Sequence, residues 1–368
     1  MAIFGPKLHR PCTNGRESAP YSSGHGKPPA LVRSAVTRGL LVAPAALAVL
    51  LVLVGRPPLV GGSGASGASG ASGASSAHLT AAAAVPPGGH AIDAKLFASG
   101  SCRSYGPTSG DRHESVFLDA GHGGIDPGSV GVTETGQTIY EATETLAVEL
   151  DASALLRAKG FTVIVSRTRA SPVVRPGPGD VSDQLYTLQG DLREVAGRDI
   201  CADMAKADIL IGIYFDAGGS PENAGSITGY DAERPFAAAN LRLATFVQKD
   251  VLAAMNGQGW DIPDDGVVTD NFLGGPPLSD AAAAYGHLLL LGPADPGYFS
   301  NPSTMPGALI EPLFITDPYE GTIASSAHGQ QVIARGLAAA VGQYFGPPEK
   351  KTPAAIPHHA AKMRKTGS

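Results

Sequence analysis

Short apolar runs alternate with longer amphipathic segments between Ser115 and about Phe345. The run at 115–120, "SVFLDA", has the length and composition of a strand, whereas "EATETLAVELDASALLRAKG", at 141–160, has the spacing of a helix closed by glycine. The other predicted strands are 161–167, 208–217, 287–292 and 307–314, and the other predicted helices are 192–207, 237–255 and 325–345. This alternation predicts an α/β fold, with a single twisted and mostly parallel sheet that helices cover on both faces.

The sequence before this region predicts a membrane anchor. Residues 1–38 carry six basic residues against the single acid Glu17 and show no hydrophobic period, which is typical of a disordered tail. The uncharged apolar run at 39–55 is somewhat shorter than the ~20 residues of a typical spanning helix. Its basic N-terminal flank predicts that the tail is cytoplasmic and that the domain lies on the cell-wall side of the membrane. A cleaved signal sequence is the alternative, and it would make the protein secreted.

Two further segments have the composition of linkers or tails. Residues 56–113 are rich in Gly, Ala, Ser and Pro and contain four tandem "GAS" triplets, which predicts a flexible tether. Residues 347–368 are predicted to be a disordered tail, so the folded domain is assigned to 114–346. The net charge of -6 gives no electrostatic footprint for nucleic acid, so no nucleic-acid partner is expected.

The cysteines bear on the compartment of the domain. Cys102 and Cys201 would be exported, whereas Cys12 would stay in the cytoplasmic tail. Disulfides persist outside the cytoplasm, but two cysteines in an exported chain need not be paired. The sequence therefore leaves a Cys102–Cys201 bridge and two free thiols equally open.

Three side chains in the domain point to chemistry. His122 lies in "FLDAGHGGIDPG", among glycines directly behind the first predicted strand, where a metal or substrate can approach closely. Glu141 begins the first long helix, and Glu311 ends an otherwise apolar strand. A buried carboxylate is costly unless it binds a cation or takes part in a reaction. A surface position is the plainer alternative for Glu141. For Glu311 the plainer alternative is a buried ion pair with Arg167 or Arg198.

Four motifs together resemble those of a known enzyme family. "FLDAGHGGIDPGSVG", "EATETL", "VIVSRT" and "MPGALIEPLFITDP" occur in the order found in the zinc-dependent N-acetylmuramoyl-L-alanine amidases of the bacterial cell wall. The resemblance covers about residues 115–346. It implies one zinc ion, with His122 and Glu141 as ligands and Glu311 as the catalytic acid/base. It also implies hydrolysis of the amide between N-acetylmuramic acid and the L-alanine of the stem peptide.

The chain departs from this family where a second histidine ligand is expected. In "GIYFDAGG" that position is occupied by Tyr214, whose phenol would have to lose its proton to compete as a zinc ligand. If the strand stays regular, Asp216 lies on the same face two residues on, which makes it the substitute third ligand, provided that the metal shifts or the strand bulges. His287 could also approach the metal, or it could be an ordinary residue at the start of a strand.

Two functions remain open at this stage. The first is a membrane-tethered peptidoglycan hydrolase. The second is an amidase fold without catalysis, which binds cell-wall peptides or a partner hydrolase and regulates wall turnover; Tyr214 is the feature that favours it. The partners expected are peptidoglycan, the membrane through the anchor and a regulatory protein. A phosphate-binding loop is a poor third reading, because no Lys and Ser/Thr complete such a motif after "GHGG".

Overall fold

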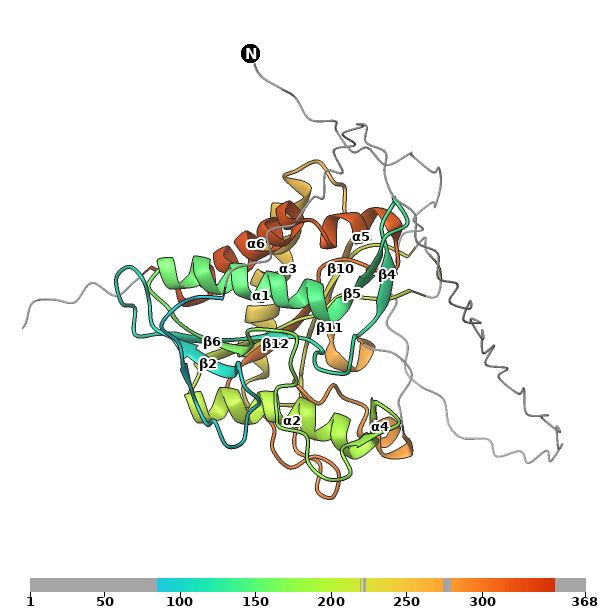
Figure 1. Ribbon diagram of the computed structural model, residues 1–368. Helices are drawn as coiled ribbons and strands as arrows, with labels where there is room; N and C mark the ends of the chain where they lie inside the picture. The colour runs from blue at the N-terminus through green and yellow to red at the C-terminus, as the bar shows by residue number, and fades with distance from the viewer. Residues whose placement is uncertain (1–84, 219, 221–222, 274–278, 348–368) are drawn as a thin grey trace, which may run out of the picture. The chain divides into compact units, whose positions relative to one another are not determined.

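The computed structural model describes residues 85–218, 220, 223–273 and 279–347 (Figure 1). The predicted cytoplasmic tail at 1–38, the anchor at 39–55, the "GAS" triplets and the tail from residue 348 onward lie outside these residues. Within the described part of the chain, no helix has both the length and the hydrophobicity to span a bilayer.

An eight-stranded sheet forms the centre of the described domain. Its strands, in spatial order, are β1 (His90–Ala91), β2 (Ser101–Tyr105), β6 (Thr162–Arg167), β3 (Ser115–Ala120), β9 (Ile209–Ile213), β12 (Gly307–Glu311), β10 (Ser226–Tyr230) and β11 (Asp264–Thr269). The central strands β6, β3, β9 and β12 run parallel, whereas β2 is antiparallel to β6 and β10 is antiparallel to β12. The predicted α/β fold is confirmed, and its sheet is mixed, with a parallel centre.

Helices cover this sheet in two layers (Figure 1). The layer above the sheet in that view contains α1 (Glu141–Ala158), α3 (Ala237–Asn256) and α6 (Ala327–Phe345). The layer below it contains α2 (Leu188–Ala205) and the short α4 (Asp280–Tyr285). The remaining elements are α5 (Pro318–Ala324), the 3₁₀ turn η1 (Asp270–Phe272) and two small hairpins, β4 (Val130–Val132) with β5 (Thr138–Tyr140) and β7 (Val181–Ser182) with β8 (Leu185–Tyr186).

The central strands are buried on both faces because helices lie above and below them. Val116 and Leu118 of β3 belong to the core beneath α1, α3 and α6, whereas Phe117 between them belongs to the core on the α2 side. Side chains of a strand alternate between faces, so a strand buried on both sides reads as one continuous apolar run. This explains why "SVFLDA" and "ILIGI" were recognised from the sequence.

The folded domain begins earlier than the sequence suggested. The tether predicted at 56–113 contains β1 and β2, and β2 is a largely buried strand of the sheet. Its Cys102 forms a disulfide with Cys201 of α2, which fixes this edge of the sheet to the helix below it. The prediction of a linker was therefore wrong from residue 85 onward, because glycine-rich composition obscured a short strand. A cross-link between residues 99 apart stabilises the fold by roughly 4 to 5 kcal/mol in the chain-entropy view.

The strand predicted at 287–292 was also wrong. "HLLLLG" forms a turn, in which the backbone N–H groups of Leu291 and Gly292 both donate to the carbonyl of Leu288. The run is rich in leucine because Leu290 and Leu291 pack into the core on the α2 side. A short apolar run can be a strand or buried irregular chain, and periodicity alone does not separate the two. The strands β10 and β11, whose sequences "SITGY" and "DDGVVT" are less apolar, were not predicted.

The parallel register brings three strand ends to one edge of the sheet. Ala120 of β3 lies beside Ile213 of β9, and Ile213 lies beside Ile310 of β12. The chain segments that follow these residues therefore meet at the same edge. In open sheets of this kind, the crevice at the carboxyl ends of the strands is where ligands bind.

Candidate functional site

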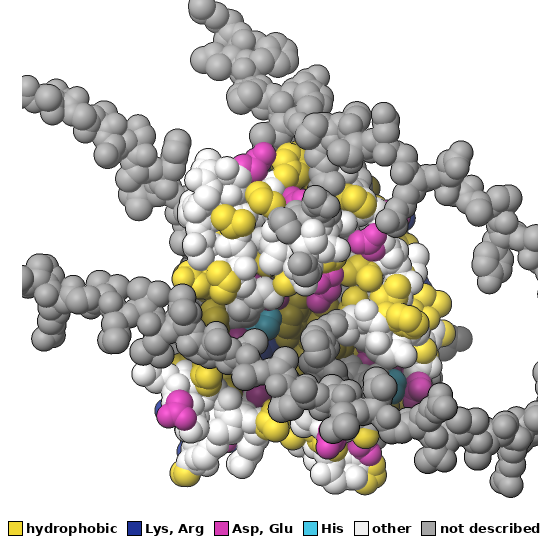
Figure 2. Space-filling view, turned by 90° about the vertical axis from the view of Figure 1, so that its right-hand side faces the viewer, with side chains coloured by type: hydrophobic (Ala, Val, Ile, Leu, Met, Phe, Trp, Pro, Cys, Tyr) yellow, Lys and Arg dark blue, Asp and Glu magenta, His cyan; other side chains and the backbone are white. Residues whose placement is uncertain are grey.

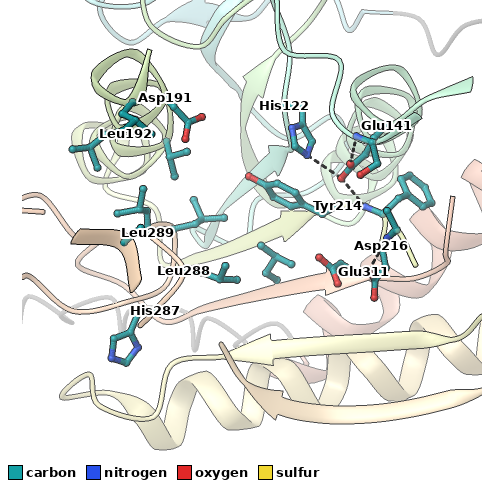
Figure 3. Close-up of a pocket in the computed structure, with 18 of the residues that line it drawn as sticks. His122, Glu141, Asp191, Leu192, Tyr214, Asp216, His287, Leu288, Leu289 and Glu311 are labelled. Carbon is teal, nitrogen blue, oxygen red and sulfur yellow. Dashed lines mark hydrogen bonds and ion pairs between the residues drawn. The ribbon is translucent and has the colours of Figure 1, made fainter. Parts of the chain in front are cut away.

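His122 and Glu141 lie against each other at this edge (Figure 3). The Nε2 atom of His122 is 3.1 Å from Oε1 of Glu141, the first residue of α1. Backbone N–H groups of Ser129 and Phe215 donate to the two oxygens of Glu141, at 2.9 and 3.0 Å. Glu141 is thus a buried, oriented carboxylate rather than a surface residue, and the alternative of a surface position is excluded.

The second nitrogen of His122 is held by another carboxylate. Its Nδ1 is 2.7 Å from Oδ2 of Asp126, which lies in the same loop and also accepts from the N–H of Gly128. Burial opposes the charged imidazole, but the hydrogen bonds and charges of Asp126 and Glu141 outweigh it and raise the pKa of His122 to about 10. With one carboxylate at each nitrogen, the site favours a positive charge on or beside this ring.

Two glycines make room for this arrangement. A Cβ atom on Gly128 would lie 2.7 Å from the ring of His122 and 2.8 Å from Cβ of Glu141, so only glycine lets the loop pass so close. A Cβ atom on Gly121 would lie 2.5 Å from the ring of Tyr214. His122 itself has φ of 62°, in the left-handed region that few non-glycine residues adopt. The bare loop therefore serves close packing around the His122 and Tyr214 rings.

Tyr214 belongs to a buried polar network beneath His122. Its hydroxyl donates to Oδ2 of Asp119 at 3.2 Å, and Nε of Arg198 donates to Oδ1 of the same carboxylate at 2.9 Å. Arg198 also donates to the backbone carbonyl of His122 at 2.8 Å, so the network supports the loop. Burial, and next the charge of Asp119, raise the pKa of Tyr214 well above its ordinary value. The hydroxyl of Tyr214 is therefore engaged with Asp119 rather than directed at His122 and Glu141.

Glu311 and Asp216 form a second carboxyl pair in the same crevice (Figure 3). Burial raises the pKa of Glu311 to about 8, and the charges of Asp216 and Glu141 add to the effect. Burial also raises the pKa of Asp216, so both carboxyl groups of the pair disfavour the ionised form, and the shift to about 8 belongs to Glu311. The alternative of an ion pair between Glu311 and an arginine is excluded, because Arg167 donates to the carbonyl of Gly121 and Arg198 pairs with Asp119.

These groups face one cavity of about 480 Å³. Its lining includes the predicted site residues His122, Glu141, Tyr214, Asp216 and Glu311, together with apolar side chains of α2 and of the 288–290 turn. Figure 2 shows the corresponding face, hollowed near its centre, with a histidine in the hollow and acidic and hydrophobic side chains around it. A groove with apolar walls and a few convergent polar groups is typical of a binding or active site.

The residues present fit two positions of a zinc ligand set. Zinc bound to a nitrogen and an oxygen at ordinary lengths in a tetrahedron separates these donors by about 3.3 Å, close to the 3.1 Å between His122 and Glu141. Asp126 at the far nitrogen supplies the second carboxylate that commonly orients such a histidine. The third position is less complete, because Tyr214 donates to Asp119 and Asp216 is engaged with Glu311.

The sequence located some of these groups and missed others. It placed His122, Glu141 and Glu311 at one site, and the structure brings them to one cavity. It did not find Asp126, although that residue lies in the same motif, nor the Asp119–Arg198 pair beneath the loop. His287 lines the same cavity but lies apart from His122 (Figure 3).

Comparison with known proteins identifies the family. Residues 116–343 match the family model described as N-acetylmuramoyl-L-alanine amidase, Amidase_3, which is more than half of the chain. This chain belongs to that family. It is 26% identical over 204 residues to N-acetylmuramoyl-L-alanine amidase LytC of Bacillus subtilis (strain 168). The match covers 55% of this chain but only 30% of that relative, so the chain spans under a third of the relative's length.

Solved amidase structures resemble the described domain. The catalytic domain of CwlV, an N-acetylmuramoyl-L-alanine amidase from Bacillus (Paenibacillus) polymyxa var. colistinus, is 22% identical with a TM-score of 0.43, over 63% of this chain and 98% of that one. The CwlD amidase of Clostridioides difficile, solved in complex with the GerS lipoprotein, is 19% identical with a TM-score of 0.47, over the same shares of the two chains.

Proposed function

We propose that this protein is a peptidoglycan hydrolase that cleaves the amide between N-acetylmuramic acid and the L-alanine of the stem peptide. The observation that carries the proposal is the 3.1 Å approach of His122 Nε2 to Glu141 Oε1 in a groove that also contains Glu311. Two donors at this spacing suit one cation, and a carboxyl group with a raised pKa beside them suits proton transfer.

His122 and Glu141 are the residues that would hold a zinc ion. When bound, zinc would supply a positive charge that polarises the amide carbonyl and favours ionised water at neutral pH. Asp126 keeps the His122 ring in place, and the Arg198 guanidinium fixes the loop carbonyl behind it. Asp216 is the proposed third ligand, which requires its carboxylate to leave Glu311.

Glu311 is the proposed catalytic acid/base. With a pKa of about 8, the Glu311 carboxyl group can be either protonated or ionised near neutral pH. The ionised carboxylate takes the proton of the attacking water, and the carboxylic acid then gives a proton to the departing nitrogen of L-alanine. Burial of Glu311 makes the carboxylate form less favourable and so keeps the proton available for that second step.

The proposed site of action is the cell wall. The basic tail at 1–38 and the apolar run at 39–55 would anchor the chain in the cell membrane, with the domain on the wall side, and the segment after the run would act as a tether. The Cys102–Cys201 disulfide suits an oxidising compartment. Cleavage after the apolar run would release the same domain.

A second candidate function keeps the groove but not the reaction. Tyr214 stands where the family has a histidine ligand and its hydroxyl donates to Asp119, which favours a domain that binds wall peptides or a partner hydrolase and regulates its activity. The two candidates predict the same fold. They differ in metal content and in the release of peptide.

Both candidates are tested with the full-length protein and purified cell wall. Zinc content is measured together with release of stem peptide from muramic acid, for the wild type and for His122→Ala. Hydrolysis predicts release by the wild type and its loss in His122→Ala. His90→Ala is the matched control, because His90 is an exposed histidine in β1. Wall binding without peptide release by the wild type would overturn the hydrolase and support the regulator.

A further inference from the structure

A second group of metal-binding side chains lies at the other wall of the groove. Asp231, Asp270 and His287 each offer one donor atom, and these atoms lie within 4.8 Å of one another. Within the described ranges, this is the one group of three such donors that converges so closely. Asp231 follows β10, Asp270 follows β11, and His287 begins the 287–292 turn, so the group joins three segments far apart in the sequence.

The two carboxylates meet at a single nitrogen. Nδ1 of His287 is 3.1 Å from Oδ2 of Asp231 and 3.2 Å from Oδ2 of Asp270. Asp231 and Asp270 are almost completely buried, with 0% and 1% of their surfaces exposed. Among the described residues, neither carboxylate has a Lys or Arg partner in an ion pair. Two buried carboxylates without such a partner are costly unless a cation lies between them.

One atom in this cluster has its hydrogen-bonding capacity unused. Oδ2 of Asp231 is buried and accepts no hydrogen bond, although it faces His287. The other oxygen, Oδ1, accepts from the backbone N–H groups of Glu233 and Arg234 at 2.8 and 2.7 Å. These two bonds fix the orientation of the carboxylate, so the unsatisfied oxygen is held toward the cluster. A buried acceptor left without a donor calls for an explanation, and a metal ion is one.

A backbone group also orients Asp270. The N–H of Leu288 donates to Oδ2 of Asp270 at 2.9 Å. The far nitrogen of His287, Nε2, lies 3.7 Å from Oε2 of Glu233. This distance is beyond hydrogen-bonding range, so Glu233 contributes at most a weak electrostatic contact to His287.

We propose that Asp231, Asp270 and His287 bind a divalent transition-metal ion, with Zn²⁺ as the ion of choice. Two carboxylate oxygens and one imidazole nitrogen form a donor set that zinc accepts, whereas calcium and magnesium prefer oxygen alone. The ion fixes the 287–292 turn to the ends of β10 and β11. Arg234 holds the same turn from its other end, since it donates to the carbonyls of Leu291 and Gly292 at 3.1 and 2.8 Å.

The site has a structural role at the groove. Leu288, Leu289 and Leu290 line the cavity that contains His122 and Glu311. A metal that holds His287 therefore positions the apolar wall of the groove without touching the reacting atoms. This inference does not depend on the proposed hydrolysis, since the ion would bind in the same way in a non-catalytic domain.

The test counts zinc in a protein whose first site has been removed. Full-length His122→Ala/Glu141→Gln is stripped with a chelator, incubated with Zn²⁺, passed through a desalting column and measured for bound zinc. The expected result is about one zinc per chain. Adding Asp231→Asn should reduce this to near zero, whereas adding Asp261→Asn should not change it, because Asp261 is exposed and outside the cluster.

Folding is followed separately, so that loss of zinc is not mistaken for loss of the fold. Far-UV circular dichroism is recorded for each variant, and His287→Gln serves as a second ligand variant if Asp231→Asn does not fold. Zn²⁺ should raise the Tm of the double variant and leave the Tm of either ligand variant unchanged. Absence of zinc from a folded double variant would overturn the proposal. Equal zinc in Asp231→Asn would overturn it as well.

Discussion

The His122 and His287 clusters face the same groove but distribute their carboxylates differently. Around His122, Asp126 and Glu141 lie at opposite nitrogens of the ring. Around His287, the two aspartates meet at the same nitrogen. Only the second arrangement directs three donor atoms to one point. The sequence motif marks the first cluster, yet the second is the more complete ligand set.

The difference shows what each cluster is built to do. At His122, Asp126 orients the ring, and Glu141 lies beside Nε2, the nitrogen that would bind the metal. Part of the coordination sphere therefore stays free for water and substrate, as a catalytic site requires. At His287 the donors come from three segments far apart in the sequence, two of them almost completely buried, and lie within 4.8 Å of one another. The predictions below test this division, from the largest expected effect to the smallest.

Removing the acid/base should produce the largest effect. Glu311→Gln keeps the size of the side chain but cannot carry the proton, so kcat for peptide release should fall by about 10²- to 10⁴-fold. Zinc bound at the His287 cluster should be unaffected. The measurement is the rate of peptide release from purified wall, with Glu134→Gln, an exposed glutamate in the β4–β5 hairpin, as control. A Glu311→Gln protein as fast as the wild type would remove Glu311 from the reaction.

Supplying the expected histidine should make the first cluster more like the second. Tyr214→His places an imidazole beside His122, whose ring centroid is 5.4 Å from that of Tyr214. Zinc affinity in the groove should rise about tenfold or more, which corresponds to about 1.4 kcal/mol. Tyr214→Phe is the control, because it loses the same hydrogen bond to Asp119 without adding a donor. Competition titration with a zinc indicator measures both in an Asp231→Asn background; equal affinities would contradict the prediction.

The carboxylates behind the two histidines should differ in how much they contribute to zinc affinity. Asp126 is 2.7 Å from His122, so Asp126→Asn should weaken zinc binding in the groove by about tenfold. Glu233 is 3.7 Å from His287 and mostly exposed, so Glu233→Gln should weaken zinc binding at its cluster by less than about threefold. The same indicator titration measures zinc affinity at each cluster, in a protein whose other cluster has lost its ligands by mutation. A larger effect for Glu233 than for Asp126 would reverse the comparison.

The sequence pointed to His122, Glu141 and Glu311 because they lie at the ends of strands and helices with clear periodicity, and the resemblance to the amidase motifs implied their roles. His122 lies two residues after β3, Glu141 begins α1 and Glu311 ends β12, and parallel strands bring such ends together. The second cluster could not be predicted in this way. Asp231 and Asp270 follow β10 and β11, which were not recognised, and His287 was assigned to a strand that does not form.

The buried polar network was missed for a related reason. Arg198 is one of several charged residues in the helix predicted at 192–207, and nothing in that pattern shows that it reaches Asp119 of β3. Such a pairing depends on which helix covers which face of the sheet. The strand β2 was missed because its five residues lie in glycine-rich sequence, and its place in the sheet depends on long-range pairing with β6.

A further prediction is a dependence of stability on pH at the first cluster. Glu311 ionises near its ordinary pKa of 4.5 when unfolded but near 8 when folded. Between these values unfolding releases a proton, so the free energy of unfolding falls as pH rises, by at most about 1.4 kcal/mol per pH unit. Glu144 and Glu149, whose pKa values burial raises to about 7 and about 8, act in the same direction in wild type and variant alike. The free energy of unfolding is measured in urea at pH 5 and pH 8 for wild type and Glu311→Gln, both treated with a chelator. The difference between the two proteins isolates the contribution of Glu311. Glu311→Gln should gain stability relative to the wild type as pH rises, and a difference that stays constant would show that Glu311 is already ionised at low pH.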